Sequence, residues 1–198
     1  MKAARIAFAV AFLAVASTAF ADPITYVAFL SGPAESPPNA SPGTGFASAT
    51  IDILAHTLAV SATFSGLTTP TTASHIHCCT AAPFTGAAGV ATQVPAFALF
   101  PIGVTAGSFS QILNTSLASS YNPAFITSVG GTVAAAEATL AAGLAAGTTY
   151  FNIHTQMFPG GEIRGFLVPA AIPEPSTVGL ISAGLVGILM LRGRRRMV

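Results

Sequence analysis

An alternation of apolar and polar residues with a period of two constrains this chain more than any other feature. It is clearest in residues 56–66, HTLAVSATFSG, where Leu58, Val60, Ala62 and Phe64 alternate with small or hydroxyl-bearing side chains. Successive side chains of a strand point to opposite sides, so this period predicts a half-buried β-strand. It also argues against a disordered linker, which the low charge and the many Ala, Thr, Ser and Gly residues would otherwise suggest.

Similar strands are predicted along the chain, with clusters of turn-forming residues between them. These strands cover residues 24–30, 45–54, 97–101, 148–154 and 162–168. Residues 132–144, which contain an alanine run and Glu137, predict a helix. Glycine disfavours helix, so Gly143 indicates that this helix is short. Many short strands and turns predict an all-β fold, a Greek-key-like β-sandwich of the immunoglobulin or superoxide dismutase kind with one short helix.

The first 21 residues have the three parts of a secretory signal peptide. Lys2 and Arg5 form a basic start, residues 6–15 are apolar, and residues 19–21 (AFA) follow the small-x-small pattern that signal peptidase cleaves. We therefore expect export, with cleavage after Ala21.

The end of the chain combines a linker, an apolar run and a basic cluster. Pro173, Glu174 and Pro175 interrupt regular structure, residues 176–191 are apolar, and residues 192–196 are rich in arginine. As a transmembrane helix the apolar run would be about 24 Å long, slightly less than a hydrocarbon core of about 30 Å, and snorkelling flanks would close the gap. The arginines belong on the cytoplasmic side, which leaves the rest of the chain outside the cytoplasm.

These three parts, in this order, resemble a PEP-CTERM sorting signal. The resemblance implies a Gram-negative bacterium and an exosortase as a transient partner. It also implies a chain anchored in the inner membrane on its periplasmic side and later moved to the cell surface or the extracellular space. The chain then divides into a signal peptide (1–21), a domain (22–171) and a sorting segment (172–198).

The predicted domain carries almost no positive charge. Apart from histidine, its one basic side chain is Arg164, so the overall charge of +1 comes from the two ends of the chain. Its acidic side chains are Asp22, Glu35, Asp52, Glu137 and Glu162. Proteins bind nucleic acids through Lys and Arg side chains that replace the counterions of the phosphates, so this composition excludes nucleic acid as a partner.

Several segments of this domain resemble those of a CHRD domain, the module named after the animal protein chordin, and follow one another in the order of that family. They are residues 30–39 (LSGPAESPPN), 64–67 (FSGL), 73–77 (ASHIH), 150–155 (YFNIHT) and 159–165 (PGGEIRG). The resemblance implies a β-sandwich with an extracellular binding role and no settled enzymatic activity. The adjacent Cys78 and Cys79 depart from the pattern of that family, in which small residues follow the second histidine.

Three histidines form a candidate metal site. In residues 150–155 the apolar side chains should face the core, which turns His154 outward. In the same way a buried Ile76 turns His75 and His77 outward. If the two strands are neighbours, opposing Cβ atoms lie about 4.5–5.5 Å apart, close enough for the three imidazoles to converge on one cation.

The histidine cluster has three interpretations. The first is a copper or zinc site, and the His-x-His pair resembles part of the copper site of copper-zinc superoxide dismutases. The second is a structural network in which the histidines bond to the turn, while Glu162 and Arg164 form a cross-strand pair beside Asn152. The third is recognition of a partner. His56 lies in a predicted hairpin turn, and we expect it at the surface.

The two cysteines have four interpretations. Because the chain is exported, Cys78 and Cys79 can form a vicinal disulfide in a turn after His77, which is the favoured interpretation. Each could instead pair with another chain, one thiolate could join the histidines as a metal ligand, or both could stay free and buried.

The sequence favours binding over catalysis. It has no Gly-x-Ser-x-Gly elbow, phosphate loop or His-Glu-x-x-His motif. Asp52 and Glu162 could form a carboxylate pair like that of glycosidases. Glycosidase clefts are normally rich in aromatic residues that stack on sugars, however, and this chain has no Trp and only 3 Tyr. We expect a non-catalytic structural or binding module of the cell surface or extracellular matrix, with exopolysaccharide or another surface protein as its partner. The alternative is a small copper or zinc protein with a redox role through the histidines and cysteines.

Overall fold

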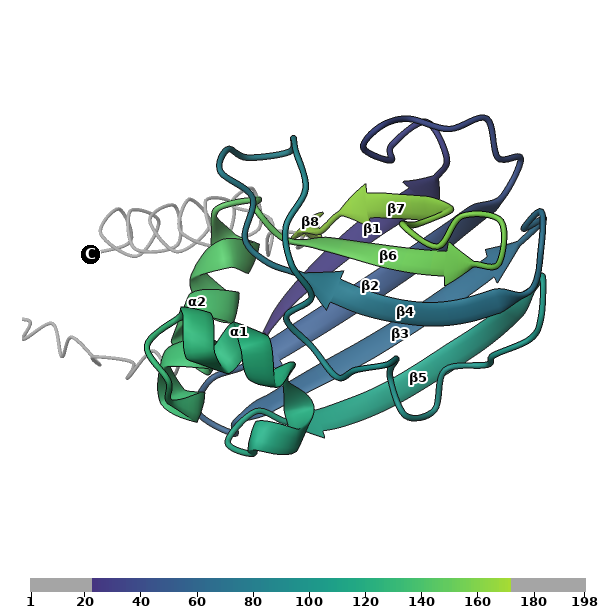
Figure 1. Ribbon diagram of the computed structural model, residues 1–198. Helices are drawn as coiled ribbons and strands as arrows, with labels where there is room; N and C mark the ends of the chain where they lie inside the picture. Colours follow the sequence, from purple (N-terminus) through teal and green to yellow (C-terminus); the bar gives the residue numbers. More distant parts are fainter. Residues whose placement is uncertain (1–22, 172–198) are drawn as a thin grey trace, which may run out of the picture.

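The strands form one curled antiparallel sheet with helices at one end (Figure 1). The structure is a computed structural model that describes residues 23–171. Its strands are β1 (Ile24–Ser31), β2 (Thr44–Asp52), β3 (Thr57–Ser65), β4 (Thr71–His77), β5 (Gly107–Asn114), β6 (Tyr150–Thr155), β7 (Ile163–Phe166) and β8 (Val168–Pro169). Its helices are the 3-10 helix η1 (Ala118–Ser120) and the α-helices α1 (Pro123–Ser128) and α2 (Val133–Ala145).

Both predicted targeting segments lie outside the described residues. They are the signal peptide with its cleavage site at Ala21 and the sorting segment with Pro173, Glu174 and Pro175. Within residues 23–171, no helix combines the length and hydrophobicity that a membrane crossing requires.

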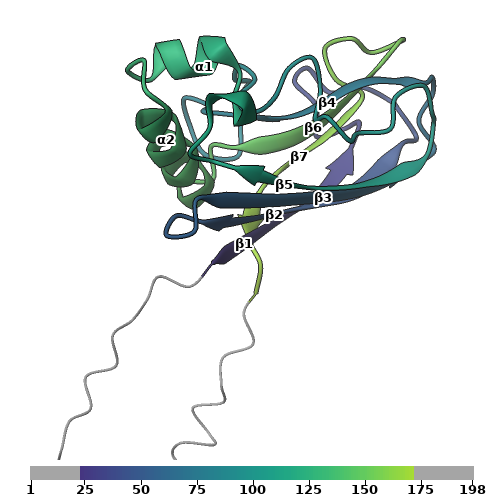
Figure 2. The same ribbon diagram turned by 90° about the horizontal axis from the view of Figure 1, so that it is seen from below.

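The strand order places the first strand, β1, beside the last strands, β7 and β8. The order is β4-β6-β7-β1-β2-β3-β5, and β8 pairs with β1. Because the sheet curls, β4, β6 and β7 lie over β1, β2, β3 and β5, as the view from below in Figure 2 shows. The prediction of an all-β fold is confirmed, but the two sandwich-like layers belong to one continuous sheet instead of two separate sheets.

The core fills the space between these layers. On β3, the alternate residues Leu58, Val60, Ala62 and Phe64 are buried, as the period of two predicts. Phe97, from the connection between β4 and β5, joins the layers. Its ring centroid is 5.1 Å from that of Phe109 on β5 and 6.0 Å from that of Phe151 on β6.

One predicted strand is wrong and one observed strand was missed. Residues 97–101 form a turn in which Phe100 N–H donates to the Phe97 carbonyl at 3.0 Å, because both rings turn into the core. The missed strand is β5. Its alternation of apolar and polar residues is obscured because the polar Gln111 points inward, where its side-chain amide donates to that of Gln93 at 3.0 Å, whereas the apolar Ile112 is exposed.

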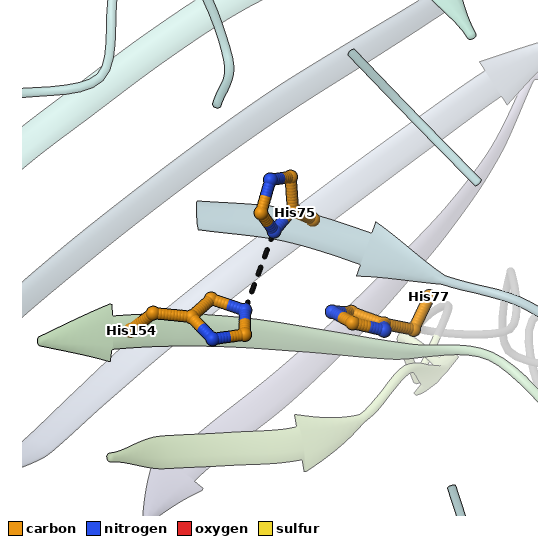
Figure 3. A group of neighbouring side chains, drawn as sticks. All are labelled: His75, His77 and His154. Atoms are coloured by element: carbon orange, nitrogen blue, oxygen red, sulfur yellow. Dashed lines mark hydrogen bonds between the residues drawn. The ribbon is translucent and has the colours of Figure 1, made fainter. Parts of the chain in front are cut away.

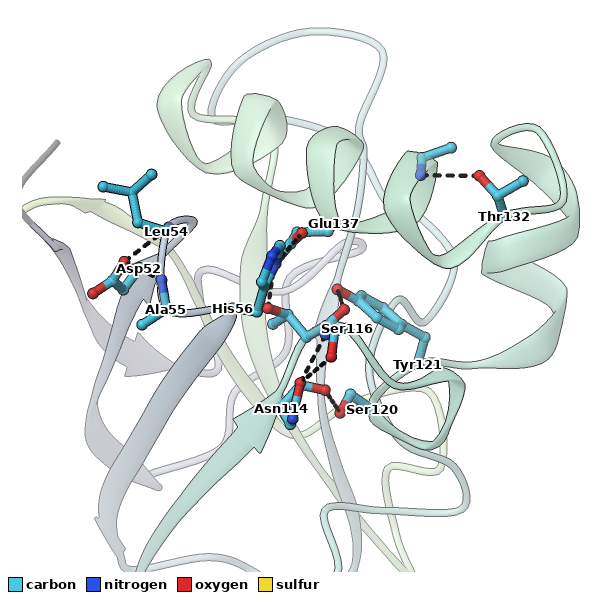
Figure 4. A network of polar contacts seen from close by, with 12 residues as sticks. Asp52, Leu54, Ala55, His56, Asn114, Ser116, Ser120, Tyr121, Thr132 and Glu137 are labelled. Atoms are coloured by element: carbon cyan, nitrogen blue, oxygen red, sulfur yellow. Dashed lines mark hydrogen bonds and ion pairs between the residues drawn. The ribbon is translucent and has the colours of Figure 1, made fainter. Parts of the chain in front are cut away.

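The helices are fixed to the sheet by a polar network at their end of the molecule (Figure 4). The predicted helix 132–144 is observed as α2, with the Thr132 side chain as its N-cap. The buried Glu137 carboxylate of α2 contacts His56 Nδ1 at 2.9 Å and accepts a short hydrogen bond from Thr115. Tyr121 donates to the Thr115 carbonyl at 3.0 Å. The predicted surface residue His56 has a half-exposed side chain and also anchors this helix.

The long connection between β4 and β5, residues 78–106, follows the free edge of β4. Ala91 N–H donates to the Ile76 carbonyl at 2.9 Å, and Phe97 N–H donates to the Ser74 carbonyl at 3.3 Å. This connection covers the outer face of β4, where the candidate site lies.

Candidate metal centre

Antiparallel pairing of β4 with β6 brings the three predicted histidines together. In this register His75 lies opposite Asn152, His77 opposite Tyr150, and His154 opposite Ala73. Figure 3 shows the three imidazoles turned toward one another from the two strands. One ring nitrogen of each histidine lies within 4.8 Å of the other two.

The cluster is buried, which differs from the prediction. His75 is 6% exposed, His77 7% and His154 8%. The three side chains do point away from the core between the layers, as strand geometry requires. The expectation of solvent exposure is wrong because loops cover this outer face, so that every residue of β6 is buried.

Each imidazole donates one ring N–H to a backbone carbonyl. His75 Nε2 is 2.6 Å from the Pro95 oxygen and His77 Nδ1 is 2.9 Å from the Ala88 oxygen. His154 Nδ1 is 3.0 Å from the Pro159 oxygen. Carbonyl oxygens only accept hydrogen bonds, so these contacts determine which nitrogen carries the proton in each neutral ring.

The remaining nitrogen of each ring is therefore a bare lone pair. His75 Nδ1 and His154 Nε2 face each other at 3.3 Å, and in the neutral rings both atoms are acceptors. His77 Nε2 is buried without a hydrogen-bond partner. Three acceptors thus converge on one region that holds no donor for them among the described side chains.

Burial keeps the three rings neutral at ordinary pH. It lowers the pKa of His75 to about 4, helped by His154 and opposed by the bond to Pro95. It lowers the pKa of His77 to about 4 in the same way, against the bond to Ala88. The pKa of His154 is also lowered by burial. The lone pairs are therefore available to a cation.

A stack of side chains extends from the cluster across β6. The Tyr150 ring lies parallel to His77, with centroids 4.7 Å apart and an interplanar angle of 9°. The guanidinium carbon of Arg164 is 4.7 Å from the centroid of the same tyrosine ring. The Tyr150 hydroxyl contacts the backbone of Ala88, whose carbonyl also holds His77. The stack therefore fixes the orientation of His77.

Arg164 is buried and pairs with a residue that the sequence did not indicate. Its Nε donates to the Ala34 carbonyl at 2.6 Å and its Nη1 to the Gly86 carbonyl at 2.9 Å. Its Nε also lies 3.7 Å from a carboxylate oxygen of Glu35. Burial raises the pKa of Glu35 to about 7, although Arg164 opposes this.

The predicted cross-strand pair of Glu162 and Arg164 is wrong. The Glu162 carboxylate accepts from Ser41 at 2.6 Å, Thr68 N–H at 2.6 Å and Thr155 at 2.5 Å. It therefore joins the β1–β2 loop, the β3–β4 loop and the end of β6, and Arg164 is not among its partners. Asn152 lies opposite Arg164 in the register, and its Oδ1 is buried without a partner.

The cysteines lie beside the cluster and not within it. Cys78 and Cys79 are joined in a disulfide, which packs against α2 near the Thr139 carbonyl. Neither sulfur belongs to the group of converging ligand atoms.

Sequence reasoning missed the groups that hold the histidines. The carbonyls of Ala88, Pro95 and Pro159 leave no trace in the side-chain pattern, because any residue type can supply a carbonyl. Glu35 could have been noticed, since it is one of few charged residues in the domain and lies in one of the segments that carry the family resemblance.

Three side chains arranged in this way can hold a transition-metal ion. Three neutral imidazoles suit zinc or copper, and a second layer of hydrogen-bond acceptors normally fixes the orientation of metal-binding histidines. Here backbone carbonyls supply that second layer.

Comparison with known sequences agrees with both resemblances. The PEP-CTERM protein-sorting motif matches residues 171–196, which marks the chain as an exosortase-sorted extracellular protein. The searches of curated proteins and of solved structures found no match. The CHRD domain matches residues 26–167, most of the chain, with the three histidines and both loops that hold them. The chain therefore belongs to the CHRD domain family.

Proposed function

We propose that the CHRD domain of this exported protein binds one transition-metal ion, copper or zinc, through His75, His77 and His154. The observation that carries the proposal is that each ring has its N–H fixed on a carbonyl and its lone pair turned toward the other two. The proposed role is a non-catalytic metal-binding module at the cell surface or in the extracellular matrix.

The spacing of the three nitrogens fits a small ion. Around a three-coordinate ion with metal–nitrogen bonds of about 2.0 Å, the nitrogens are about 3.5 Å apart. The observed 3.3 Å between His75 Nδ1 and His154 Nε2 is close to this value, and all three nitrogens lie within 4.8 Å. Small rotations of the rings would complete the geometry.

A purely structural network explains the cluster less well. Each buried polar atom without a partner costs about 1–3 kcal/mol, and the structural interpretation leaves three acceptors facing one another. A bound cation would satisfy all three at once. Copper would supply one-electron redox chemistry there, whereas zinc would act as a redox-inert Lewis acid.

The test is the metal content of the full chain, produced with its export signals, without a histidine tag and without chelators. We expect about one copper or zinc ion per chain, lost in His75→Ala and in His154→Ala. His56→Ala is the matched control, because this histidine lies outside the cluster, and it should keep the metal. Circular dichroism would verify folding. A folded, metal-free chain that takes up neither added ion would contradict the proposal.

A second candidate function, binding of a neutral exopolysaccharide, is favoured by the outer face of β1, β2, β3 and β5. In these four strands Asp52 is the one charged residue. Phe29 is 80% exposed, and its ring lies 5.3 Å from that of Phe46 on the neighbouring strand. Phe46 borders a shallow hollow of about 240 Å³ lined mainly by serine and threonine. Exposed rings beside hydroxyl groups can stack on and hydrogen-bond to sugars.

Cosedimentation with insoluble neutral glucans tests this second function. We expect the full chain to sediment with the glucan and a Phe29→Ala, Phe46→Ala double variant to stay in solution. Leu99→Ala is the control, since Leu99 is similarly exposed but lies outside these strands. Equal sedimentation of the double variant would exclude this face as the binding surface.

A further inference from the structure

We propose that the three-histidine site selects monovalent copper, Cu(I), over divalent ions. This inference rests on the proposed metal-binding function and concerns the charge of the ion.

The first layer of the site is uncharged. The three candidate ligands are neutral imidazoles, and no carboxylate or thiolate among residues 23–171 joins the group. The sulfur atoms of Cys78 and Cys79 are bonded to each other and so supply no thiolate. A metal ion here would keep its full charge.

The second layer is uncharged as well. Histidine ligands of zinc are often backed by a carboxylate, which offsets part of the charge of the ion. Here the hydrogen bonds of all three rings go to backbone carbonyls, those of Pro95, Ala88 and Pro159. These acceptors orient the rings without adding negative charge.

A full positive charge is linked to the cluster through a stack of rings. The Arg164 guanidinium stacks on Tyr150, which in turn stacks on His77. The field of this guanidinium acts on any ion held at the cluster. Glu35, 3.7 Å from Arg164, offsets this field in part when it is ionised.

These surroundings penalise a divalent ion more than a monovalent one. The cost of moving an ion from water into a medium of low dielectric grows with the square of its charge, so it is about four times greater for a divalent ion of similar size. Repulsion by Arg164 grows linearly with the charge. Imidazoles also suit copper, and three of them satisfy an ion that needs few ligands.

The test compares the affinities of the untagged full chain for Cu(I) and Zn(II). Cu(I) is buffered by bicinchoninate with ascorbate under anaerobic conditions, and Zn(II) by a competing chromophore. We expect Cu(I) to bind at least about a hundredfold more tightly. Equal or tighter Zn(II) binding would overturn the selectivity and leave metal binding intact. If the folded chain binds neither ion, both proposals fail.

Charge variants test the electrostatic cause directly. Removing the cation in Arg164→Gln should raise the logarithm of the Zn(II) affinity about twice as far as that of Cu(I), because the interaction scales with the charge of the ion. Arg164→Lys keeps the charge and is the matched control. If Arg164→Gln does not fold, Glu35→Gln takes its place. Removing this negative charge should lower both affinities, and the logarithm of the Zn(II) affinity should fall about twice as far as that of Cu(I). Equal responses of the two ions would overturn the charge argument.

One further control separates nitrogen from sulfur ligation. The Cys78→Ser, Cys79→Ser double variant should bind Cu(I) within about twofold of the unmodified chain, because the ligands are imidazoles. Loss of Cu(I) binding in this variant, with folding retained, would assign the ion to the cysteines and overturn the inference.

Discussion

At the scale of single residues, two buried glutamates show that the neighbours of a carboxylate determine the direction in which its pKa shifts. Burial alone would raise the pKa of Glu162, but the hydrogen bonds from Ser41, Thr155 and Thr68 outweigh it and lower this pKa. Glu35 has a buried carboxylate oxygen without a partner, and burial raises its pKa to about 7. Their contributions to stability therefore change with pH in opposite directions.

The raised pKa of Glu35 predicts a pH-dependent loss of stability. Its pKa of about 7 in the folded protein exceeds the ordinary 4.5, so the folded state holds the proton more tightly than the unfolded state. This contribution is complete below about pH 4.5 and is lost as the pH rises through about 7. Between these values the unmodified metal-free chain should lose on the order of 1–3 kcal/mol relative to Glu35→Gln.

Urea unfolding of both metal-free proteins across this pH range measures the difference. Because the three histidines are present in both proteins, their own titration cancels in the comparison. Parallel stability profiles would show that Glu35 does not titrate abnormally.

At the scale of elements, the period of two predicted most strands, and tertiary contacts explain the exceptions. Strands β1, β2, β3, β6 and β7 were predicted close to their observed bounds. Strand β5 was missed because a single inward glutamine, Gln111, breaks its alternation. Alternation indicates which face of a strand is apolar, but it does not reveal that a loop covers the other face. The histidine face of β4 and β6 was therefore predicted correctly and its burial was not.

The contact between β7 and β1 depends on a glycine. A Cβ atom at Gly165 would lie 2.2 Å from the Phe29 carbonyl oxygen, which is too close for any side chain. Gly165→Ala should therefore force these strands apart and reduce the free energy of unfolding by more than about 2 kcal/mol. Gly160→Ala is the matched control, because a Cβ there meets nothing within 4 Å. Chemical denaturation of both variants measures the effect, and equal stabilities would refute this account of the contact.

At the scale of the whole molecule, the histidine cluster joins parts of the chain that are distant in sequence. Its histidines come from β4 and β6, while their carbonyl partners come from the β4–β5 connection and the turn before β7. An ion at the cluster would fix these segments together. None of this coupling can be read from the sequence, because it depends on which loops cover which strands.

Metal binding should consequently stabilise the fold. At a free ion concentration about a thousandfold above Kd, the gain is about 4 kcal/mol if only the folded state binds. Differential scanning calorimetry of the full chain should show a higher Tm with Cu(I) than after its removal. His75→Ala should have the same Tm in both conditions. A Tm of the unmodified chain that does not depend on the metal would count against a site formed by the folded domain.

The most direct test of the three-histidine site is X-ray absorption spectroscopy of the full chain loaded with one equivalent of Cu(I). The account predicts about three nitrogen neighbours at about 2.0 Å, with the multiple-scattering pattern of imidazole rings and no sulfur. Sulfur neighbours at about 2.3 Å, or a shell of oxygen atoms without imidazole scattering, would contradict it.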